Sequence, residues 1–395
     1  MHIPEFDDLE AWSQFQSLWH LRDDTTYLNH GSFGPPPEPV RAARLEWVRQ
    51  VDSQPMDFFF RQQEAAWIAA REKLAEFLAT EPERLVFVEN ATAGMNVVAH
   101  NVALRPGDQV VLTNHEYGAV KRIWTRACQC AGADPPVIAR LPEQIESEQQ
   151  VVDAILSKIN QKTRLLVISH ITSPTALILP VDAICDAARQ QGVEVCIDGP
   201  HAPAQVPLDL SRLGCDYYTA SCHKWLCAPF GSGFLSVAEA HWDDWSPATL
   251  SWGRLLPDRP ETWWHEFVWS GTRDPSAYLT IPTAIEFLET IGLDYFRARA
   301  HALARYARQQ LVEMIGIEPP YPDSPQWYGT MALVPLPAVD AVQLQRSLWR
   351  EDGIEVPIID FESKRFIRVS CHLYNTPEQI DDLVRAVHRR LRDAT

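Results

Sequence analysis

The chain has 395 residues, of which 46% are apolar and 22% charged, a composition typical of a globular protein with one or two domains. Its 35 basic and 52 acidic residues give a net charge of −17, which argues against a nucleic-acid partner because phosphate backbones need a basic stripe. No apolar run reaches the roughly 20 residues of a membrane helix, and the acidic N-terminus lacks a signal-peptide core. We therefore expect a soluble cytoplasmic protein without a membrane partner.

The N-terminal part of the chain predicts an arm, a turn and two helices. Residues 1–25 are expected to form a helical arm, and residues 27–34 a strand that enters a glycine turn. Apolar residues recur at three- and four-residue spacing over 39–50 and 62–79, which predicts two helices.

A strand is expected over residues 84–89, directly before a turn of small residues that opens a helix. Asn90 or Thr92 can cap this helix. A strand, a small-residue turn and a helix N-terminus together form a ready anion site, although an ordinary capped helix fits the pattern as well.

The central part of the chain alternates strands and helices. Strands are expected over 109–113, 163–170, 193–198 and 231–237, with a further buried strand from residue 217. Helices are expected over 151–159 and 180–189, and residues 132–150 form a variable-looking connection. This alternation predicts a parallel sheet covered by helices.

The C-terminal part follows a different, α+β pattern. Helices are expected over 275–291, 293–315, 341–351 and 376–392, and strands over 330–335 and 365–370. Arg368 lies in the second of these apolar strands and needs an anion, for which a bidentate carboxylate is the natural partner. A structural salt bridge is the alternative.

The chain contains eight cysteines and no CxxC pair. No two pairs have the spacing of a zinc site, so we expect free thiols in a reducing compartment and no metal site.

Two stretches point to a specific chemistry. Lys224 follows the apolar strand that starts at residue 217 and is itself followed by Trp225. A lysine buried in such a place has a lowered pKa and becomes a nucleophile for carbonyls, most often as a Schiff base with pyridoxal 5'-phosphate (PLP). A surface lysine at a strand end is the plain alternative. Asp198 ends the preceding strand, and PLP needs such a carboxylate at its pyridine nitrogen.

Together these stretches resemble the class V aminotransferase family of fold-type I PLP enzymes, and within it the isopenicillin N epimerase-like branch, which also contains C–S lyases. The resemblance runs in the family's order across nearly the whole chain. The stretches that carry it are 27–34, 90–94, 115–119, 198–201, 221–224, 270–274 and 368–371.

The resemblance implies an α/β fold with three parts. These are an N-terminal arm packing with the small domain (1–25), a large PLP-binding domain with a mostly parallel seven-stranded sheet (26–274), and a smaller α+β C-terminal domain (275–395). It also implies a homodimer with shared active sites, since Thr272 is the residue that reaches the neighbouring subunit's phosphate.

The resemblance further assigns the cofactor and substrate contacts. Lys224 holds PLP, Asp198 contacts its ring nitrogen, and Tyr117 stacks on its ring, with His115 as the alternative. The phosphate contacts are Thr92, the backbone of Ala93, Ser221 and His223, and the contacts of the pyridoxal hydroxyl are Ser173 and His201. Arg368 binds the substrate α-carboxylate, and Asn29 and His30 are candidate substrate contacts. Relatives often have asparagine at position 173 and glycine at position 176, so Ser173 and Ala176 depart from the pattern.

The implied reaction begins when the neutral amine of Lys224 takes the α-proton of a small amino-acid substrate. Epimerisation is the leading hypothesis, and its second proton donor could be Tyr117, His30 or His201. β-Elimination by a C–S lyase is the alternative, and transamination is a weaker one. Cysteine desulfurase is disfavoured, because residues 353–364 contain no cysteine.

Two other classes of protein fit less well. The intact set of Lys224, Asp198 and Arg368 argues against a binding protein that has lost catalysis. A nucleotide-binding protein is excluded by the lack of a GxGxxG or P-loop motif after any strand.

Overall fold

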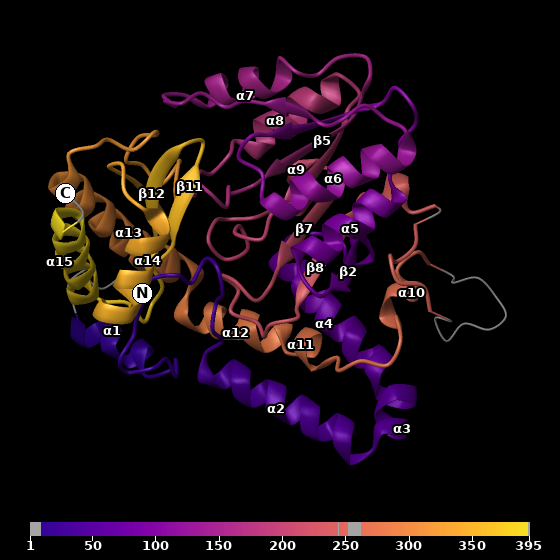
Figure 1. The fold of residues 1–395 in the computed structure, drawn as a ribbon. Helices are drawn as coiled ribbons and strands as arrows, with labels where there is room; N and C mark the ends of the chain where they lie inside the picture. Colours follow the sequence, from indigo (N-terminus) through magenta and orange to yellow (C-terminus); the bar gives the residue numbers. More distant parts are fainter. Residues whose placement is uncertain (1–8, 244, 252–261, 394–395) are drawn as a thin grey trace.

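The computed structural model describes residues 9–243, 245–251 and 262–393, and it consists of a large and a small lobe (Figure 1). The large lobe is built on a seven-stranded sheet with the strand order β2-β8-β7-β6-β5-β3-β4. Strand β8 is antiparallel to both of its neighbours, and all other neighbouring pairs are parallel, which confirms the predicted sheet. The strands are β2 (Leu85–Val88), β3 (Gln109–Thr113), β4 (Val137–Ala139), β5 (Thr163–Ser169), β6 (Glu194–Asp198), β7 (Tyr217–Ser221) and β8 (Gly233–Val237).

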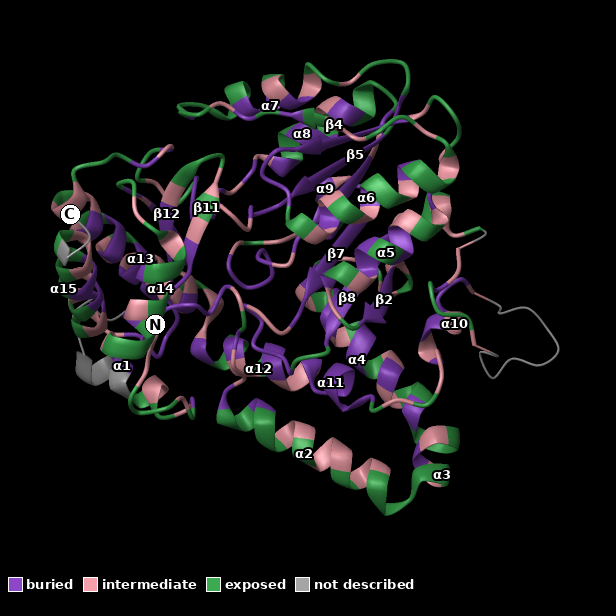
Figure 2. Ribbon diagram, in the orientation of Figure 1, coloured by how far each residue is buried: buried purple, intermediate pink, exposed green. Residues whose placement is uncertain are grey.

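Helices cover this sheet, so its central strands are buried (Figure 2). Such strands read as continuous apolar runs, which is why the sequence predicts them well. The helices of this part are α2 (Glu38–Ser53), α3 (Pro55–Asp57), α4 (Gln63–Phe77), α5 (Ala91–Asn101), α6 (Gly118–Ala131), α7 (Glu148–Leu156), α8 (Val181–Gln190), α9 (Leu210–Leu213), α10 (His265–Val268), α11 (Ser276–Leu279) and α12 (Ile281–Ile291). A π-helical turn (Phe58–Gln62) joins α3 to α4, and short 3-10 turns lie at Pro82–Arg84 and Glu239–His241.

The connection predicted over 132–150 contains a strand that the sequence did not indicate, and also the start of the helix predicted over 151–159. Strand β4 adds a short edge to the sheet beside β3. It is only three residues long and directly follows two prolines, so it carries no alternating pattern. Helix α7 begins at Glu148, three residues before the expected start, because Ser147 and Gln150 form a capping box.

The small lobe contains a three-stranded antiparallel sheet of the order β11-β12-β9. Its strands are β9 (Met331–Leu336), β11 (Ile358–Phe361) and β12 (Lys364–Ser370), and its helices are α13 (Leu293–Ile315), α14 (Ala341–Asp352) and α15 (Pro377–Asp393). Among the helices of the described residues, none combines the length and the apolarity that a bilayer span requires.

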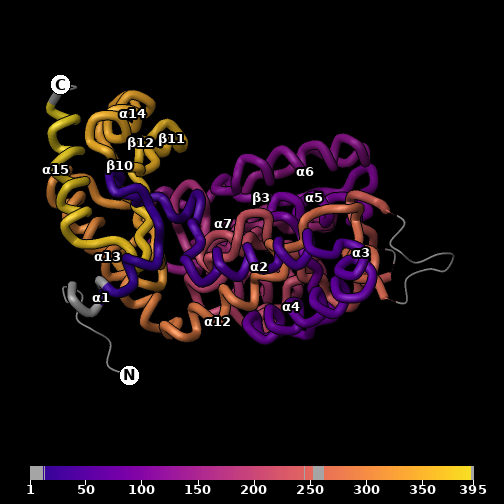
Figure 3. The backbone as a smooth tube through the Cα atoms, turned by 90° about the horizontal axis from the view of Figure 1, so that it is seen from below, coloured from indigo at the N-terminus to yellow at the C-terminus, as the bar shows by residue number. Residues whose placement is uncertain are grey.

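The N-terminal segment lies against this lobe, as the indigo and yellow tubes show (Figure 3). Strand β1 (Thr26–Tyr27) pairs in parallel with β10 (Ile354–Glu355), and Asn29 forms a bridge with Ser370. Helix α1 (Leu9–Gln16) precedes it, and the Gln16 side chain donates to the Tyr374 carbonyl oxygen at 3.3 Å. Residues 1–8 of the predicted arm lie outside the described residues, and the division into an arm and two domains stays a prediction.

Helix α5 approaches β7 so closely that only glycine fits at one position. A Cβ atom on Gly94 would lie 2.0 Å from Thr219 Oγ1 and 2.9 Å from Thr219 Cβ. This contact sets the distance of the helix N-terminus from the sheet.

We therefore expect Gly94→Ala to destabilise the protein by about 1–3 kcal/mol, the usual result of overpacking, despite the better helix propensity of alanine. Urea unfolding would measure the effect. Gly118→Ala is the matched control, because nothing lies within 4 Å of the added Cβ at that helical glycine. Equal stability of the two variants would contradict the close approach.

Candidate active site

A cavity of about 560 Å³ lies where β6 and β7 end, the edge at which open α/β sheets bind ligands. Its wall also includes the N-termini of α5 and α6 and strand β12 of the small lobe. Nine of the predicted site residues line it: Thr92, Tyr117, Ser173, Asp198, His201, Ser221, His223, Lys224 and Arg368.

Lys224 follows β7 in a turn and is half-buried beside His201 and Trp225. Its Nζ lies 3.2 Å from His201 Nε2, and the Trp225 indole N–H donates to His201 Nδ1 at 3.2 Å. Because an indole can only donate, the proton of neutral His201 lies on Nε2, which then donates to a neutral lysine amine. Burial and the charge of Arg368 lower the pKa of Lys224 to about 7, against the opposing effect of Asp198. A large fraction of Lys224 is therefore the nucleophilic free amine near neutral pH.

Asp198 is a buried carboxylate that faces this cavity without a partner. Its side chain is 3% exposed, and no hydrogen bond reaches its carboxylate from the described residues. Burial and the nearby Glu116 raise the pKa of Asp198 to about 7, while Lys224 opposes this shift. A protonated ring nitrogen would supply the missing hydrogen bond and the missing charge.

Glu116 is a second buried carboxylate near Asp198, and no role was predicted for it. Its two oxygens accept hydrogen bonds from Thr113 and Ser169, each at 2.6 Å. Ser169 lies beside Asp198 in the register of β5 and β6. Burial raises the pKa of Glu116. The only sequence feature that could have indicated Glu116 was its position in a motif at the end of a strand.

Arg368 is a buried cation with no carboxylate partner among the described residues. It donates to the Ser173 carbonyl oxygen and, at 3.1 Å, to Ser32 Oγ, whereas its Nε has no partner. Burial lowers the pKa of Arg368 to about 10. The structural salt bridge considered as the alternative is therefore not present in the described part of the chain.

The N-terminus of α5 forms the other end of the cavity. The Ala91 N–H donates to Ser221 Oγ at 3.0 Å, and the Ala93 N–H donates to the Asn90 cap at 2.9 Å. Ala93 does not line the cavity, but Thr92 does. His223 also lines it, and its buried Nδ1 has no partner. Thr92, Ser221 and His223 thus surround a helix N-terminus that suits an anion.

The two candidates for ring stacking lie in different places. Tyr117, the N-cap of α6, is 50% exposed and lines the cavity. His115 lines a different cavity between the lobes, where its Nδ1 lies 2.8 Å from Thr175 Oγ1 and its ring contacts Phe361 edge-on. The geometry favours Tyr117.

Three further predicted residues do not line the cavity: Asn29, His30 and Thr272. Thr272 is exposed, and Asn29 lines a neighbouring cavity. The turn after His30 nevertheless reaches the lysine, because a Cβ on Gly34 would lie 2.6 Å from the Lys224 carbonyl oxygen.

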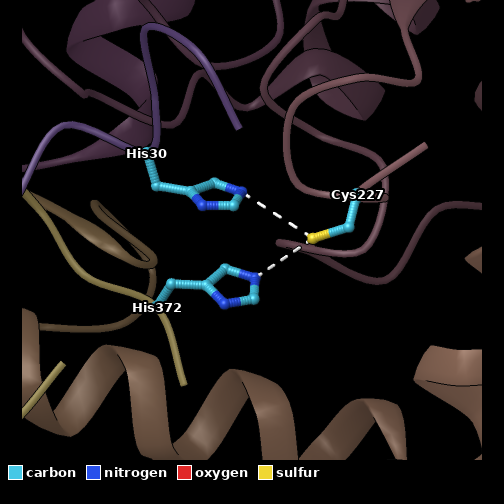
Figure 4. A group of neighbouring side chains, drawn as sticks. All are labelled: His30, Cys227 and His372. Carbon is cyan, nitrogen blue, oxygen red and sulfur yellow. Dashed lines mark hydrogen bonds between the residues drawn. The ribbon is translucent and has the colours of Figure 1, made fainter. Parts of the chain in front are cut away.

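His30 belongs to a buried cluster with Cys227 and His372 behind the lysine (Figure 4). Its Nε2 lies 3.1 Å from the Lys224 carbonyl oxygen, and its Nδ1 lies 3.0 Å from the Tyr374 hydroxyl. Since a carbonyl only accepts, His30 donates to it and fixes the backbone of Lys224. The rings of His30 and His372 stack with 4.1 Å between their centroids and an angle of 16° between their planes. Because a histidine nitrogen binds a metal ion in the plane of its ring, two stacked rings cannot both bind one ion between them. The cluster is therefore structural.

Comparison with known proteins agrees with this site. The family model of class-V aminotransferases matches residues 46–383. An isopenicillin N epimerase from Amycolatopsis lactamdurans is 37% identical, covering 95% of this chain and 98% of its own. A putative L-cysteine desulfhydrase from Oryza sativa subsp. japonica is 30% identical, covering 95% of this chain and 85% of its own. A solved structure of a C-DES mutant with glycine covalently linked to its PLP cofactor has a TM-score of 0.80 and 21% identity, covering 95% of this chain and 98% of that one.

The chain belongs to the class V aminotransferase family and is a PLP-dependent enzyme of fold type I. The residues present fit that cofactor. Asp198 offers an unpaired carboxylate for the ring nitrogen, and Lys224 a free amine for the aldehyde. Thr92 and His223 offer polar groups for the phosphate at the start of α5.

Proposed function

We propose that this protein removes the α-proton of an amino acid or an amino-acid-containing substrate, and that its reaction is most like that of an isopenicillin N epimerase. One observation carries the proposal. One cavity contains a lysine whose pKa is lowered to about 7, together with an arginine and a carboxylate that have no ionic partner among the described residues.

In this proposal each side chain has one task. Bound PLP supplies an electron sink for the pair that the departing α-proton leaves behind. Arg368 binds the substrate α-carboxylate through its fork of N–H donors. Lys224 takes the α-proton as a general base, for which a pKa of about 7 is well suited. Asp198 holds the proton on the ring nitrogen. His201 has a single N–H, on Nε2, which contacts Lys224 here and would be the donor to the pyridoxal hydroxyl when the cofactor is bound.

The second proton carrier of an epimerase has to act from the face opposite Lys224. His201 lies 3.2 Å from Lys224 Nζ and is therefore on the wrong side, and His30 does not line the cavity. Tyr117 lines the cavity from a different element, the start of α6. We assign the second proton to Tyr117.

Proton NMR of the PLP-loaded protein in D2O with a panel of amino acids, including cysteine and its thioether conjugates, tests the proposal. Deuterium at the α-carbon with loss of chirality, and with no loss of amino acid, is the expected result. Pyruvate and ammonia together with a released sulfur fragment would instead identify a C–S lyase, the class to which the rice relative's name points. A complete lack of α-exchange would overturn the proposal.

Tyr117→Phe separates the two roles of this tyrosine. The variant keeps a ring that can stack on the cofactor but loses the hydroxyl. We expect α-deuterium exchange to fall less than about threefold and racemisation to fall about 10²-fold or more, the usual contribution of a positioned acid. NMR exchange and chiral chromatography of the same samples measure the two rates. Parallel losses would show that Tyr117 carries no separate proton.

We further propose a homodimer with shared active sites. Exposed Thr272 does not line the cavity of its own chain, which fits a role in a second subunit's cavity. Helices α2 and α3 run along one edge of the molecule (Figure 1), and they carry Leu45 and Met56, which are 68% and 61% exposed. Sedimentation velocity tests the proposed homodimer.

The cysteines are free thiols, which fits a reducing compartment such as the cytoplasm.

A further inference from the structure

A second cavity of about 410 Å³ lies next to the active site. Phe33 lines both cavities, and the neighbouring Ser32 accepts a hydrogen bond from Arg368. The two cavities are therefore neighbours with Phe33, which is 64% exposed, as their common wall. A side chain that extends from a substrate held by Arg368 would have this space available.

The walls of the second cavity combine aromatic rings with one carboxylate. Tyr27, Phe33 and Trp349 supply the rings, and Glu355 and Arg22 supply charges of opposite sign. The fold fixes this combination, because Tyr27 pairs with Glu355 in the register of β1 and β10. The Tyr27 hydroxyl donates to the Phe33 carbonyl oxygen at 2.6 Å, so the Tyr27 ring is held against the Phe33 backbone.

Glu355 has capacity left for a ligand. Its Oε1 accepts a hydrogen bond from Asn29 Nδ2 at 3.2 Å, and no arginine or lysine of the described residues pairs with it. The cation in this lining, Arg22, lies 5.9 Å from the centre of the Trp349 ring and is already paired with Asp24 at 2.6 Å. Asn29 is 8% exposed, and its Oδ1 has no hydrogen-bond partner. Among the described residues that line the cavity, Glu355 and Asn29 thus have acceptor capacity left, whereas the positive charge of Arg22 is paired with Asp24.

We propose that this cavity is a subsite for the positively charged end of a substrate side chain, a guanidinium or an ammonium group. Aromatic faces attract such cations through their quadrupole, and a carboxylate pairs with them directly. The same walls disfavour a side chain that ends in a carboxylate, because Glu355 would repel it. This inference rests on the proposed function for its substrate, but the binding of a cation to the subsite can be measured without any reaction.

Calorimetric titration of the PLP-loaded protein with butylguanidinium tests the subsite directly. This probe has an apolar stem and a cationic end, and it lacks the α-amino acid group. We expect saturable binding that weakens about tenfold in Glu355→Gln and several-fold in Trp349→Leu. Glu313→Gln, an exposed site on α13, is the matched control and should bind as the wild type does. No saturable binding, or equal binding by Glu355→Gln, would overturn the subsite.

The α-exchange assay then connects the subsite to the reaction. Arginine should exchange with a KM about tenfold lower than that of norleucine, and Glu355→Gln should raise the KM of arginine selectively. Equal KM values for arginine and norleucine would overturn the side-chain role while leaving the proposed α-proton chemistry intact. Loss of exchange with every amino acid would overturn that chemistry, and the butylguanidinium titration would still decide whether the subsite exists.

Discussion

Replacing Lys224 by alanine is expected to lower α-deuterium exchange by about 10³-fold or more, since a positioned general base alone contributes 10²–10⁴. The reason lies in the position and the pKa of Lys224. Lys224 is the lysine that lines the cavity, and burial lowers its pKa to about 7, so it supplies the neutral amine. The exchange rate in D2O, measured by proton NMR, and the absorbance of the loaded protein would both change.

Two comparisons distinguish this role from a structural one. Lys224→Arg keeps a cation of similar length but cannot supply a neutral amine, so it should be as inactive as the alanine variant. Methylamine added to Lys224→Ala should restore part of the exchange, because it supplies a small free amine to the space left by the side chain. An active arginine variant would contradict the role of Lys224 as a base.

The fold was predictable for elements whose local hydrophobic pattern matches their burial in the folded protein. The buried strands β5, β6 and β7 are apolar over most of their length and end in polar turns, which is a strong signal. Strands β10 and β11 were missed because they are only two and four residues long. Strand β10 pairs with β1, which lies more than 300 residues earlier in the chain.

The sequence predicted which residues form the site, but not which hydrogen-bond or ion-pair partners their side chains have. Lys224 and Asp198 stand at strand ends, so a topological rule places them together. No local pattern could show that Arg368 lacks an acidic partner or that Trp225 fixes the tautomer of His201, because these facts depend on neighbours from other elements. Asn29 illustrates the same limit. The chain does bring it beside the active site, but the pairing of β1 with β10 turns it towards Glu355.

Asp198→Asn is expected to lower α-deuterium exchange by about 10²–10³-fold, the scale of losing one preorganised electrostatic group in a buried site. Asparagine has nearly the same shape but no charge, so it cannot keep the ring nitrogen protonated. Asp198→Glu keeps the charge and should retain more activity than the asparagine variant. Equal exchange in Asp198→Asn and the wild type would show that this carboxylate has no electronic role.

The same substitution should change how stability depends on pH in the cofactor-free protein. The pKa of Asp198 is raised from 3.8 to about 7 in the folded state, so the unfolded chain loses this proton first as the pH rises. The contribution of Asp198 is therefore fully present below about pH 4 and is lost as the pH rises through about 7, by up to about 4 kcal/mol. Asp198→Asn has no such titration, so its stability relative to the wild type should increase from pH 4 to pH 7. Urea unfolding of both proteins across this range measures the difference, and a constant difference would mean that Asp198 ionises in the folded protein as it does in the unfolded chain.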